Sequence, residues 1–217
     1  MVALLSKSLP FVASLGGALL LTLFLTPLVR EMNRRLGMVD KPDPRRINKV
    51  PIPRGGGLAL VLGVFVSYSL FVVFTGRPAL QTVATASDAL YWKIVALGSL
   101  LAAIGYMDDK VSLPPKAKLL GQVLVAALVW AWGDLGFRRL WPHLPAWVDC
   151  ALTVFWITGA INAFNLIDGL DGLASGIALI ATLGMGAATA IAHNPQAILF
   201  HLAFAGGLLG FLRYNYN

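Results

Sequence analysis

Residues 162–174 read N-A-F-N-L-I-D-G-L-D-G-L-A, and an apolar run lies on each side of this stretch. Two asparagines and two aspartates, Asn162, Asn165, Asp168 and Asp171, fall within ten residues of one another. The 217-residue chain holds only ten acidic residues, and 12% of its residues are charged. Polar residues that are scarce elsewhere and concentrated here indicate a site at the junction of two apolar segments.

The composition is that of an integral membrane protein, because 58% of the residues are hydrophobic and soluble domains contain about 45–50%. A bilayer offers the backbone no hydrogen-bond partners, so helices are the natural spanning elements. We therefore predict an all-α, polytopic bundle in which residues 1–217 form a single transmembrane domain. Glycine patches at Gly184/Gly186 and Gly206-Gly207 predict close helix packing. Apolar runs predict about seven spans, at 10–29, 55–74, 92–107, 119–132, 147–166, 173–192 and 197–212.

The distribution of lysine and arginine predicts the orientation of these spans. Twelve of the 17 cationic residues fall in the loop 30–54, the loop near residues 110–118 and the C-terminal tail. Cytoplasmic loops are the ones enriched in cations, so we predict an outside N-terminus and an inside C-terminus. Both acidic clusters then face the cytoplasm at the plasma (inner) membrane. The net charge of +7 is explained mainly by topology, and we expect a lipid bilayer and not nucleic acid as the partner.

Asp108 and Asp109 form the second acidic cluster, at the end of the third apolar run in G-Y-M-D-D-K. The simplest interpretation is a pair of solvated residues where a helix leaves the membrane. Against it, adjacent carboxylates repel each other, charge at this depth is costly, and a helix C-terminus disfavours negative charge. These three penalties indicate a compensating group: a metal, a lysine or a reacting proton.

Asn165, Asp168 and Asp171 are spaced i, i+3, i+6. On one helix they would lie within roughly 120° of a common face. That arrangement suits a divalent cation, or donors such as a nucleobase and a ribose. The alternative is a turn between two helices in which these residues serve as N-caps.

The stretch S-L-P-P-K-A-K-L-L-G-Q follows the Asp108–Asp109 pair. Pro114 and Pro115 favour a helix start, which places Lys116 and Lys118 in or near the first turn. A helix N-terminus with lysines is a plausible phosphate site. Equally, these lysines are what cytoplasmic topology requires.

Three segments together resemble the polyprenyl-phosphate N-acetylhexosamine-1-phosphate transferases of glycosyltransferase family 4. They are V-D-K-P-D-P-R-R-I-N-K-V-P-I-P-R-G-G-G, G-Y-M-D-D-K-V-S-L-P-P-K-A-K-L-L-G-Q and N-A-F-N-L-I-D-G-L-D-G-L-A. The phospho-MurNAc-pentapeptide branch is expected to have P-T-M-G-G and a threonine where this chain has P-R-G-G-G and Ile167. The chain is therefore more similar to the undecaprenyl-phosphate GlcNAc-1-phosphate transferase-like branch.

The resemblance implies transfer of N-acetylhexosamine-1-phosphate from a UDP-sugar to undecaprenyl phosphate, with release of UMP and with Mg²⁺ as cofactor. Such a reaction starts cell-wall or surface-polysaccharide synthesis. It further implies site roles for seven residues: Asp108 and Asp109 as the catalytic pair, Asn165 at the metal, and Lys118, Asn162, Asp168 and Asp171 at the substrates.

Two departures from the family pattern stand out. Asn48 occupies a position where a histidine is usual. Family members also continue past the equivalent of Asn217 into a G-D-x-G-S loop with a further metal-binding aspartate, so the resemblance implies a C-terminally truncated chain that alone catalyses no transfer. The three histidines are not expected to compensate, because His143 and His193 fall in outer loops and His201 lies inside an apolar run. The alternatives are a fragment that binds polyprenyl phosphate or a partner half, and a seven-helix receptor or transporter.

The predicted orientation can be tested with single cysteines at Ser112 and Thr82 and accessibility labelling in intact cells. We expect labelling from outside at Thr82, which lies in a cation-poor loop, and protection at Ser112. Labelling of Ser112 but not Thr82 would reverse the topology.

Overall fold

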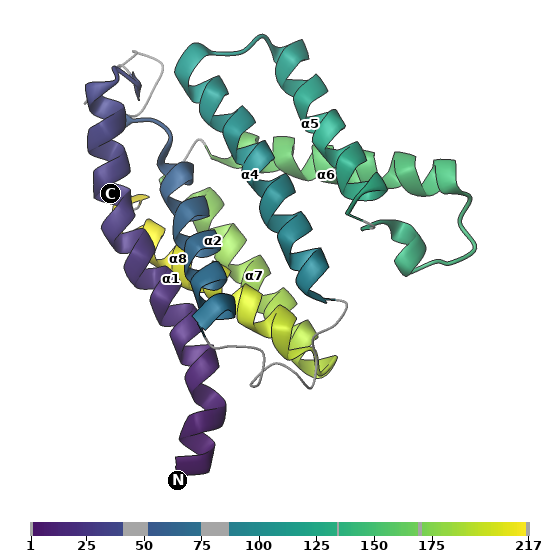
Figure 1. Ribbon diagram of the computed structural model, residues 1–217. Helices are drawn as coiled ribbons and strands as arrows, with labels where there is room; N and C mark the ends of the chain where they lie inside the picture. The colour runs from purple at the N-terminus through teal and green to yellow at the C-terminus, as the bar shows by residue number, and fades with distance from the viewer. Residues whose placement is uncertain (1, 41–51, 75–86, 134, 169–170, 216–217) are drawn as a thin grey trace. The chain divides into compact units, whose positions relative to one another are not determined.

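The computed structural model describes residues 2–40, 52–74, 87–133, 135–168 and 171–215. The chain forms two compact units, one of residues 1–85 with 170–217 and the other of residues 86–169. The first unit contains α1 (Val2–Arg35), β1 (Val39–Asp40), β2 (Ile52–Pro53), α2 (Gly56–Phe74), α7 (Leu173–Ile191) and α8 (Pro195–Asn215) (Figure 1). The second contains α4 (Ser87–Val111), α5 (Pro115–Ala131), the short 3₁₀ helix η1 (Phe137–Arg139) and α6 (Ala146–Ile167).

Seven long helices in the described ranges coincide with the seven predicted spans. Five of them are long and apolar enough to cross a membrane, namely those containing Leu9–Arg35, Leu90–Val111, Ala146–Ile167, Leu173–Ile191 and Pro195–Asn215. The apolar part of α2 is shorter, and α5 has 17 residues. The all-α, polytopic fold class is therefore confirmed.

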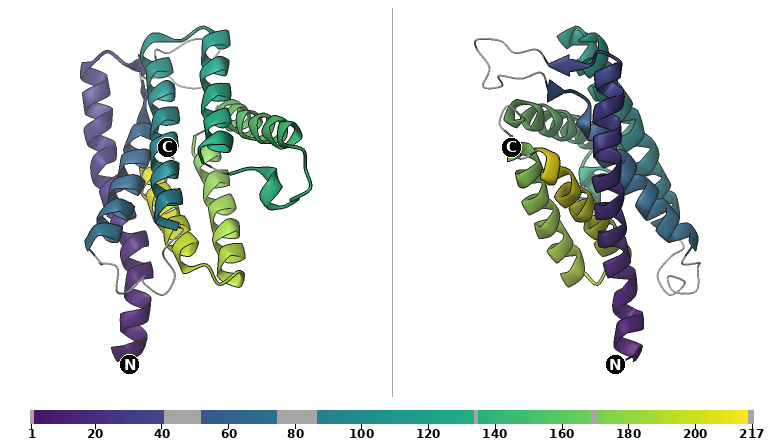
Figure 2. Two further views of the ribbon diagram at one scale, coloured as in Figure 1. Left: turned by 45° about the vertical axis from the view of Figure 1, so that its right-hand side comes forward. Right: turned by 90° about the vertical axis from the view of Figure 1, so that its left-hand side faces the viewer.

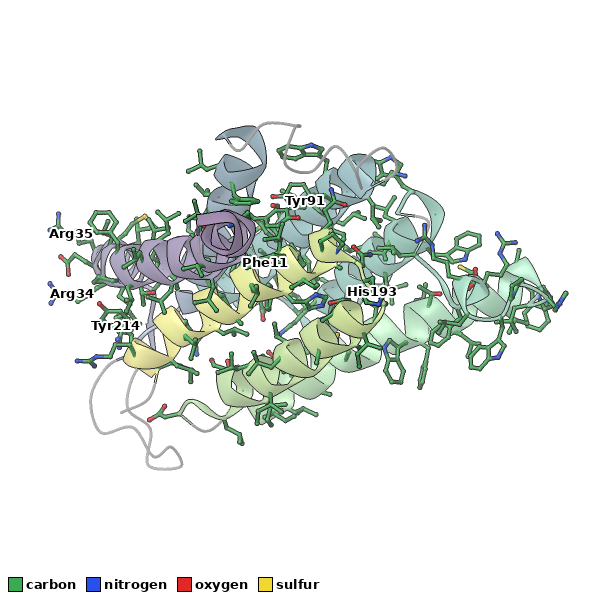
Figure 3. All side chains as sticks on the ribbon, turned by 90° about the horizontal axis from the view of Figure 1, so that it is seen from below. Phe11, Arg34, Arg35, Tyr91, His193 and Tyr214 are labelled. Carbon is green, nitrogen blue, oxygen red and sulfur yellow. The ribbon has the colours of Figure 1, made fainter. Side chains whose placement is uncertain are left out.

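Helix α1 continues through Pro27, and α8 compensates for the hydrogen bond lost there. Proline has no N–H, so the carbonyl oxygen of Leu23 loses its i+4 donor. The hydroxyl of Tyr214 on α8 donates to that oxygen at 3.1 Å, and Tyr214 lies beside α1 (Figure 3). A defect within one helix thus specifies its packing partner.

Two more hydroxyl groups tie the helices of the first unit together. Ser14 of α1, which is fully buried, donates to the carbonyl oxygen of Leu199 on α8 at 2.7 Å. Tyr68 of α2 donates to the carbonyl oxygen of Gln196 at 3.3 Å. The Tyr68 ring also meets Phe200 edge to face, with centroids 5.6 Å apart. Such bonds satisfy buried polar atoms that hydrocarbon cannot.

Glycines allow α8 to approach α1 closely. A Cβ atom at Gly206 would overlap the backbone of Leu15, and one at Gly210 would lie 2.7 Å from the carbonyl oxygen of Leu19. The pair forms a G-x-x-x-G pattern, which is common where membrane helices touch. The prediction for Gly206-Gly207 is confirmed, whereas a Cβ at Gly184 would meet nothing within 4 Å. The prediction of close packing at Gly184 was therefore wrong among the described residues, whereas a Cβ at Gly186 would lie 3.4 Å from the Cβ of His201 on α8.

A two-stranded antiparallel sheet, β1 with β2, was not predicted. It follows α1 and is fixed by Asn33, a fully buried residue whose side-chain amide donates to the carbonyl oxygen of Arg54 at 2.7 Å. Residues 41–51, which include Asn48, lie outside the described residues.

In the second unit α4 and α5 form an antiparallel hairpin, and α6 crosses α5 at a steep angle (Figures 1 and 2). The hairpin turns at residues 112–114, where Ser112 has a φ of 51°. Pro114 is the N-cap and Pro115 the first residue of α5, as predicted. The turn therefore places Lys118 beside the end of α4.

Close packing at Gly206 can be tested with Gly206→Ala and the matched control Gly16→Ala, because a Cβ at Gly16 would meet nothing within 4 Å. Alanine stabilises a helix interior by up to about 1 kcal/mol over glycine, so the control should be neutral or slightly stabilising. At Gly206 we expect a loss of about 1–3 kcal/mol from overpacking, measured as the free energy of unfolding in detergent. Equal effects of the two substitutions would contradict the close α1–α8 contact.

Candidate functional site

Asp108 is held in the last turn of α4 by two partners. Its Oδ1 accepts a hydrogen bond from the backbone N–H of Leu113 at 3.0 Å. Its Oδ2 forms an ion pair with Lys118 Nζ at 2.8 Å, and both side chains are largely shielded from solvent. Of the three compensating groups that the sequence left open, the structure provides the lysine.

Lys118 connects this carboxylate to α6, because its Nζ also donates to Asn165 Oδ1 at 3.4 Å. Four residues away on α5, Gln122 accepts a hydrogen bond from Asn162 of α6 at 2.7 Å. Residues three or four apart share a helix face, so two side chains from each helix meet across the α5–α6 contact. We call Lys118, Gln122, Asn162 and Asn165 the polar seam.

Asn162 is committed to the protein itself. Its Nδ2 donates to Gln122 Oε1 at 2.7 Å and to the carbonyl oxygen of Thr158 at 2.8 Å. These two bonds use both amide hydrogens, and Gln122 is only 2% exposed. A substrate that needed a donor from Asn162 would have to break one of these bonds. The arrangement favours a positioning role for Asn162.

Asp168 follows the last residue of α6 as its C-cap. The charge of Asp109 acts on the Asp168 carboxyl group. The residue is exposed, yet protein around its carboxyl group reduces hydration there. That burial, and secondarily the charge of Asp109, raises the pKa of Asp168 above its ordinary value. A nearby cation would therefore favour the ionised form of Asp168.

Asp171 does not continue the helix face of Asn165 and Asp168, and this part of the prediction was wrong. Helix α6 ends at Ile167, and Gly172 adopts a left-handed conformation with φ of 73°, which an α-helix cannot contain. The N-cap interpretation also fails at α7, because Gly172 is the N-cap residue and no side chain caps it. Asp171 is exposed and belongs to the first unit.

The described residues include no cluster of three or more His, Cys, Asp or Glu side chains that could hold a metal. Mg²⁺ needs fewer protein ligands, since it is usually bound by one or two carboxylates together with waters and substrate phosphates. Asp109, Asp168 and the amide oxygen of Asn165 provide oxygen donors only, which is the chemistry Mg²⁺ prefers. The donor set fits a magnesium ion that phosphates help to hold.

Gln122 is the site residue that the sequence interpretation missed. Its position four residues after Lys118 was the available signal, because i and i+4 share a helix face. His201 behaves as expected, with its Nδ1 2.6 Å from the carbonyl oxygen of Ala197 in its own helix. His193 lies in the turn between α7 and α8 (Figure 3).

These observations define a polytopic helical membrane protein with a carboxylate–lysine–amide site at the ends of its helices. Residues 91–217 match the family described as glycosyl transferase family 4, and the chain belongs to this family.

Curated relatives agree with the assignment. The chain is 35% identical over 208 residues to a probable undecaprenyl-phosphate N-acetylglucosaminyl 1-phosphate transferase of Bacillus subtilis, covering 92% of this chain and 54% of that protein. It is 31% identical over 230 residues to a decaprenyl-phosphate N-acetylglucosaminephosphotransferase of Mycobacterium tuberculosis, covering 92% and 52%. A phospho-N-acetylmuramoyl-pentapeptide-transferase of Listeria monocytogenes is 28% identical over 195 residues, covering 82% and 57%. The chain thus spans about half the length of the curated relatives it matches.

The Gln122–Asn162 bond can be tested by a double-mutant cycle. Asn162→Leu leaves the buried Gln122 oxygen without its donor and should cost about 1–3 kcal/mol, whereas removing both polar groups together should cost less than the sum of the single changes. The measurement is the free energy of unfolding in mixed detergent micelles for both single variants and for Gln122→Leu/Asn162→Leu. Strict additivity would show that the two side chains are not coupled.

Proposed function

We propose that this chain carries the polar site of a phosphoglycosyl transferase of the plasma membrane. The reaction moves N-acetylhexosamine-1-phosphate from a UDP-sugar to undecaprenyl phosphate and releases UMP. The GlcNAc-1-phosphate transferase activities for which the Bacillus and Mycobacterium relatives are named support this substrate class. Predicted topology supports a site on the cytoplasmic side of the membrane, where soluble nucleotide sugars are available.

The observation that carries the proposal is the position of Lys118 between Asp108 and Asn165. An ammonium group shared by a carboxylate and an amide oxygen is already oriented, so a phosphate group can take the place of one partner with little reordering of the side chain. Phosphate accepts charge-assisted hydrogen bonds from lysine readily. Lys118 is therefore proposed to hold a phosphate of the donor or of the lipid acceptor.

Asp108 and Asp109 are proposed as the catalytic pair. Asp108 orients Lys118, and one carboxylate of the pair accepts the proton of the lipid phosphate as that phosphate attacks the sugar diphosphate. Asn162 supports the pair indirectly by fixing α6 against Gln122. Asp168 and Asp171 are proposed for the nucleotide end, where carboxylates can accept hydrogen bonds from ribose or base.

Mg²⁺ is the proposed cofactor, held by Asn165 with the neighbouring carboxylates Asp109 and Asp168 and with substrate phosphates. When bound, it supplies positive charge that offsets the charge of the diphosphate. The same positive charge would relieve the repulsion between Asp109 and Asp168.

The catalytic pair can be tested with Asp108→Asn and Asp109→Asn, using Glu31→Gln as the matched control. Glu31 is a carboxylate in exposed ion pairs with Arg34 and Arg35, and such pairs contribute little. In membranes that hold the chain with a co-expressed segment matching the other half of the Bacillus subtilis relative, the variant that removes the proton acceptor should lower kcat by about 10²–10⁴-fold, with UDP-GlcNAc binding retained. Normal turnover in both variants would remove the pair from the mechanism.

The overall function can be tested by the transfer of radiolabelled GlcNAc-1-phosphate from UDP-GlcNAc into the lipid phase with Mg²⁺ present. Membranes would contain the 217-residue chain alone, or the chain with a co-expressed segment matching the other half of the Bacillus subtilis relative. We expect Mg²⁺-dependent transfer in the second preparation. Binding of polyprenyl phosphate without transfer in either one would favour the alternative, a non-catalytic binding module.

A further inference from the structure

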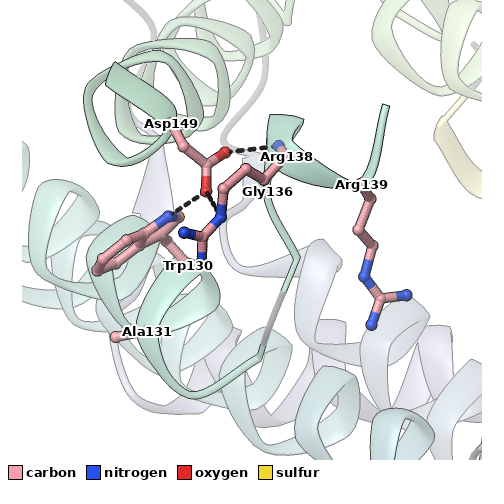
Figure 4. Close-up of a pocket in the computed structure, with 6 residues that line it drawn as sticks. All are labelled: Trp130, Ala131, Gly136, Arg138, Arg139 and Asp149. Carbon is pink, nitrogen blue, oxygen red and sulfur yellow. Dashed lines mark hydrogen bonds and ion pairs between the residues drawn. The ribbon is translucent and has the colours of Figure 1, made fainter. Parts of the chain in front are cut away.

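A second polar centre lies at the other end of α5. Trp130 is twelve residues after Lys118, which corresponds to about 18 Å along the helix axis. A cavity of about 210 Å³ opens there (Figure 4). Its lining residues are Trp130, Ala131, Gly136, Arg138, Arg139 and Asp149. None of them belongs to the site described above.

Asp149 organises this cavity. It is 2% exposed, and its Oδ2 accepts a hydrogen bond from Trp130 Nε1 at 2.6 Å. Its Oδ1 accepts one from the backbone N–H of Arg138 at 2.9 Å, and Arg138 Nε lies 3.7 Å from Oδ2. A side chain at Gly136 would lie 2.7 Å from Oδ1, so the loop can close over the carboxylate only with glycine there. The carboxylate thus fixes both the loop and the start of the Arg138 side chain.

Arginine side chains outnumber carboxylates among the described residues that line the cavity. Arg138 and Arg139 contribute two cations, and the Asp149 carboxylate among them is surrounded by donors. The Arg138 side chain is half exposed, and the Arg139 guanidinium points away from Asp149 (Figure 4). A ligand at this place would meet guanidinium groups before it met the buried carboxylate.

The residues around the cavity are those of a membrane interface. Four of the six tryptophans in the chain lie between residues 130 and 147. Trp141 is 60% exposed and Trp147 is 76% exposed. The Trp141 ring stacks on Phe137 of η1, with an interplanar angle of 6°. Tryptophan is enriched where headgroups meet hydrocarbon, so the two arginines lie at headgroup level.

From this combination we infer that the cavity binds the phosphate of an anionic phospholipid. Arg138 and Arg139 contact the headgroup, Asp149 positions Arg138, and Trp141 and Trp147 lie along the acyl chains. The ligand is a bilayer lipid and not a substrate of the transfer reaction. The inference is independent of the function proposed for the polar seam.

The test measures binding of short-chain phosphatidylglycerol to the purified 217-residue protein in neutral detergent by tryptophan fluorescence. Phosphatidylcholine of the same chain length is the zwitterionic reference. We expect tighter binding of phosphatidylglycerol, and a loss of about fivefold in its affinity for each arginine removed in Arg138→Gln/Arg139→Gln. Arg138→Lys/Arg139→Lys should retain most of the preference. Arg139→Gln alone, which leaves the Arg138–Asp149 contacts in place, should show the single loss if the double variant does not fold.

Arg34→Gln/Arg35→Gln is the matched control, because these adjacent exposed arginines are paired with Glu31 at the end of α1 (Figure 3). It should keep the wild-type preference. Asp149→Asn separates position from charge, since it makes the cavity more positive yet releases Arg138; we expect weaker binding. Three results would each overturn the inference. They are tighter binding in Asp149→Asn, equal losses of affinity in Arg138→Gln/Arg139→Gln and Arg34→Gln/Arg35→Gln, and competition by soluble glycerol phosphate as strong as by the lipid.

Discussion

Hydrocarbon provides no hydrogen-bond partners, and this constraint explains polar contacts between helices in both units. The Leu23 carbonyl, which loses its donor to Pro27, recovers one from Tyr214. In the second unit Asn162 bonds to Gln122 between α5 and α6. Apolar side chains alone would leave the helices free to slide, because lipid and leucine are equally apolar. Each polar bond therefore fixes a register between helices, and the site depends on that register.

In the polar seam, the register between α5 and α6 determines which side chains meet at the candidate site. Gln122 is buried, Asn162 is partly buried, and their hydrogen bond fixes α5 against α6. One helical turn nearer the start of α5, the same helix contact places Lys118 beside Asn165. The turn between α4 and α5 also places Lys118 beside Asp108. A phosphorylated ligand would meet a lysine that is already charged, oriented and partly desolvated, which strengthens its attraction for anions.

The helices were predictable because long apolar runs leave the chain few alternatives in lipid. The start of α5 followed from Pro114 and Pro115. Asp171 was misplaced because the spacing argument assumed an uninterrupted helix, whereas Gly172 adopts a left-handed conformation. Gln122 was missed because an amide in an apolar run shows no partner in the sequence; its partner Asn162 lies forty residues away. Periodicity reports which face a residue occupies, but not which other helix meets that face.

Two carboxylates illustrate how structure separates a structural role from a functional one. Asp149 is buried, and a tryptophan N–H and a backbone N–H, both fixed by the fold, bind its oxygens. Replacing those donors with a ligand would require the loop to open. Asp108 is less buried, and one of its two partners is the ammonium group of Lys118 at the end of a flexible chain. Rotation of the lysine side chain alone would let its ammonium group exchange the carboxylate for a phosphate. A carboxylate whose partner can leave without disturbing the backbone is suited to chemistry. This criterion supports the catalytic role proposed for Asp108 and a structural role for Asp149.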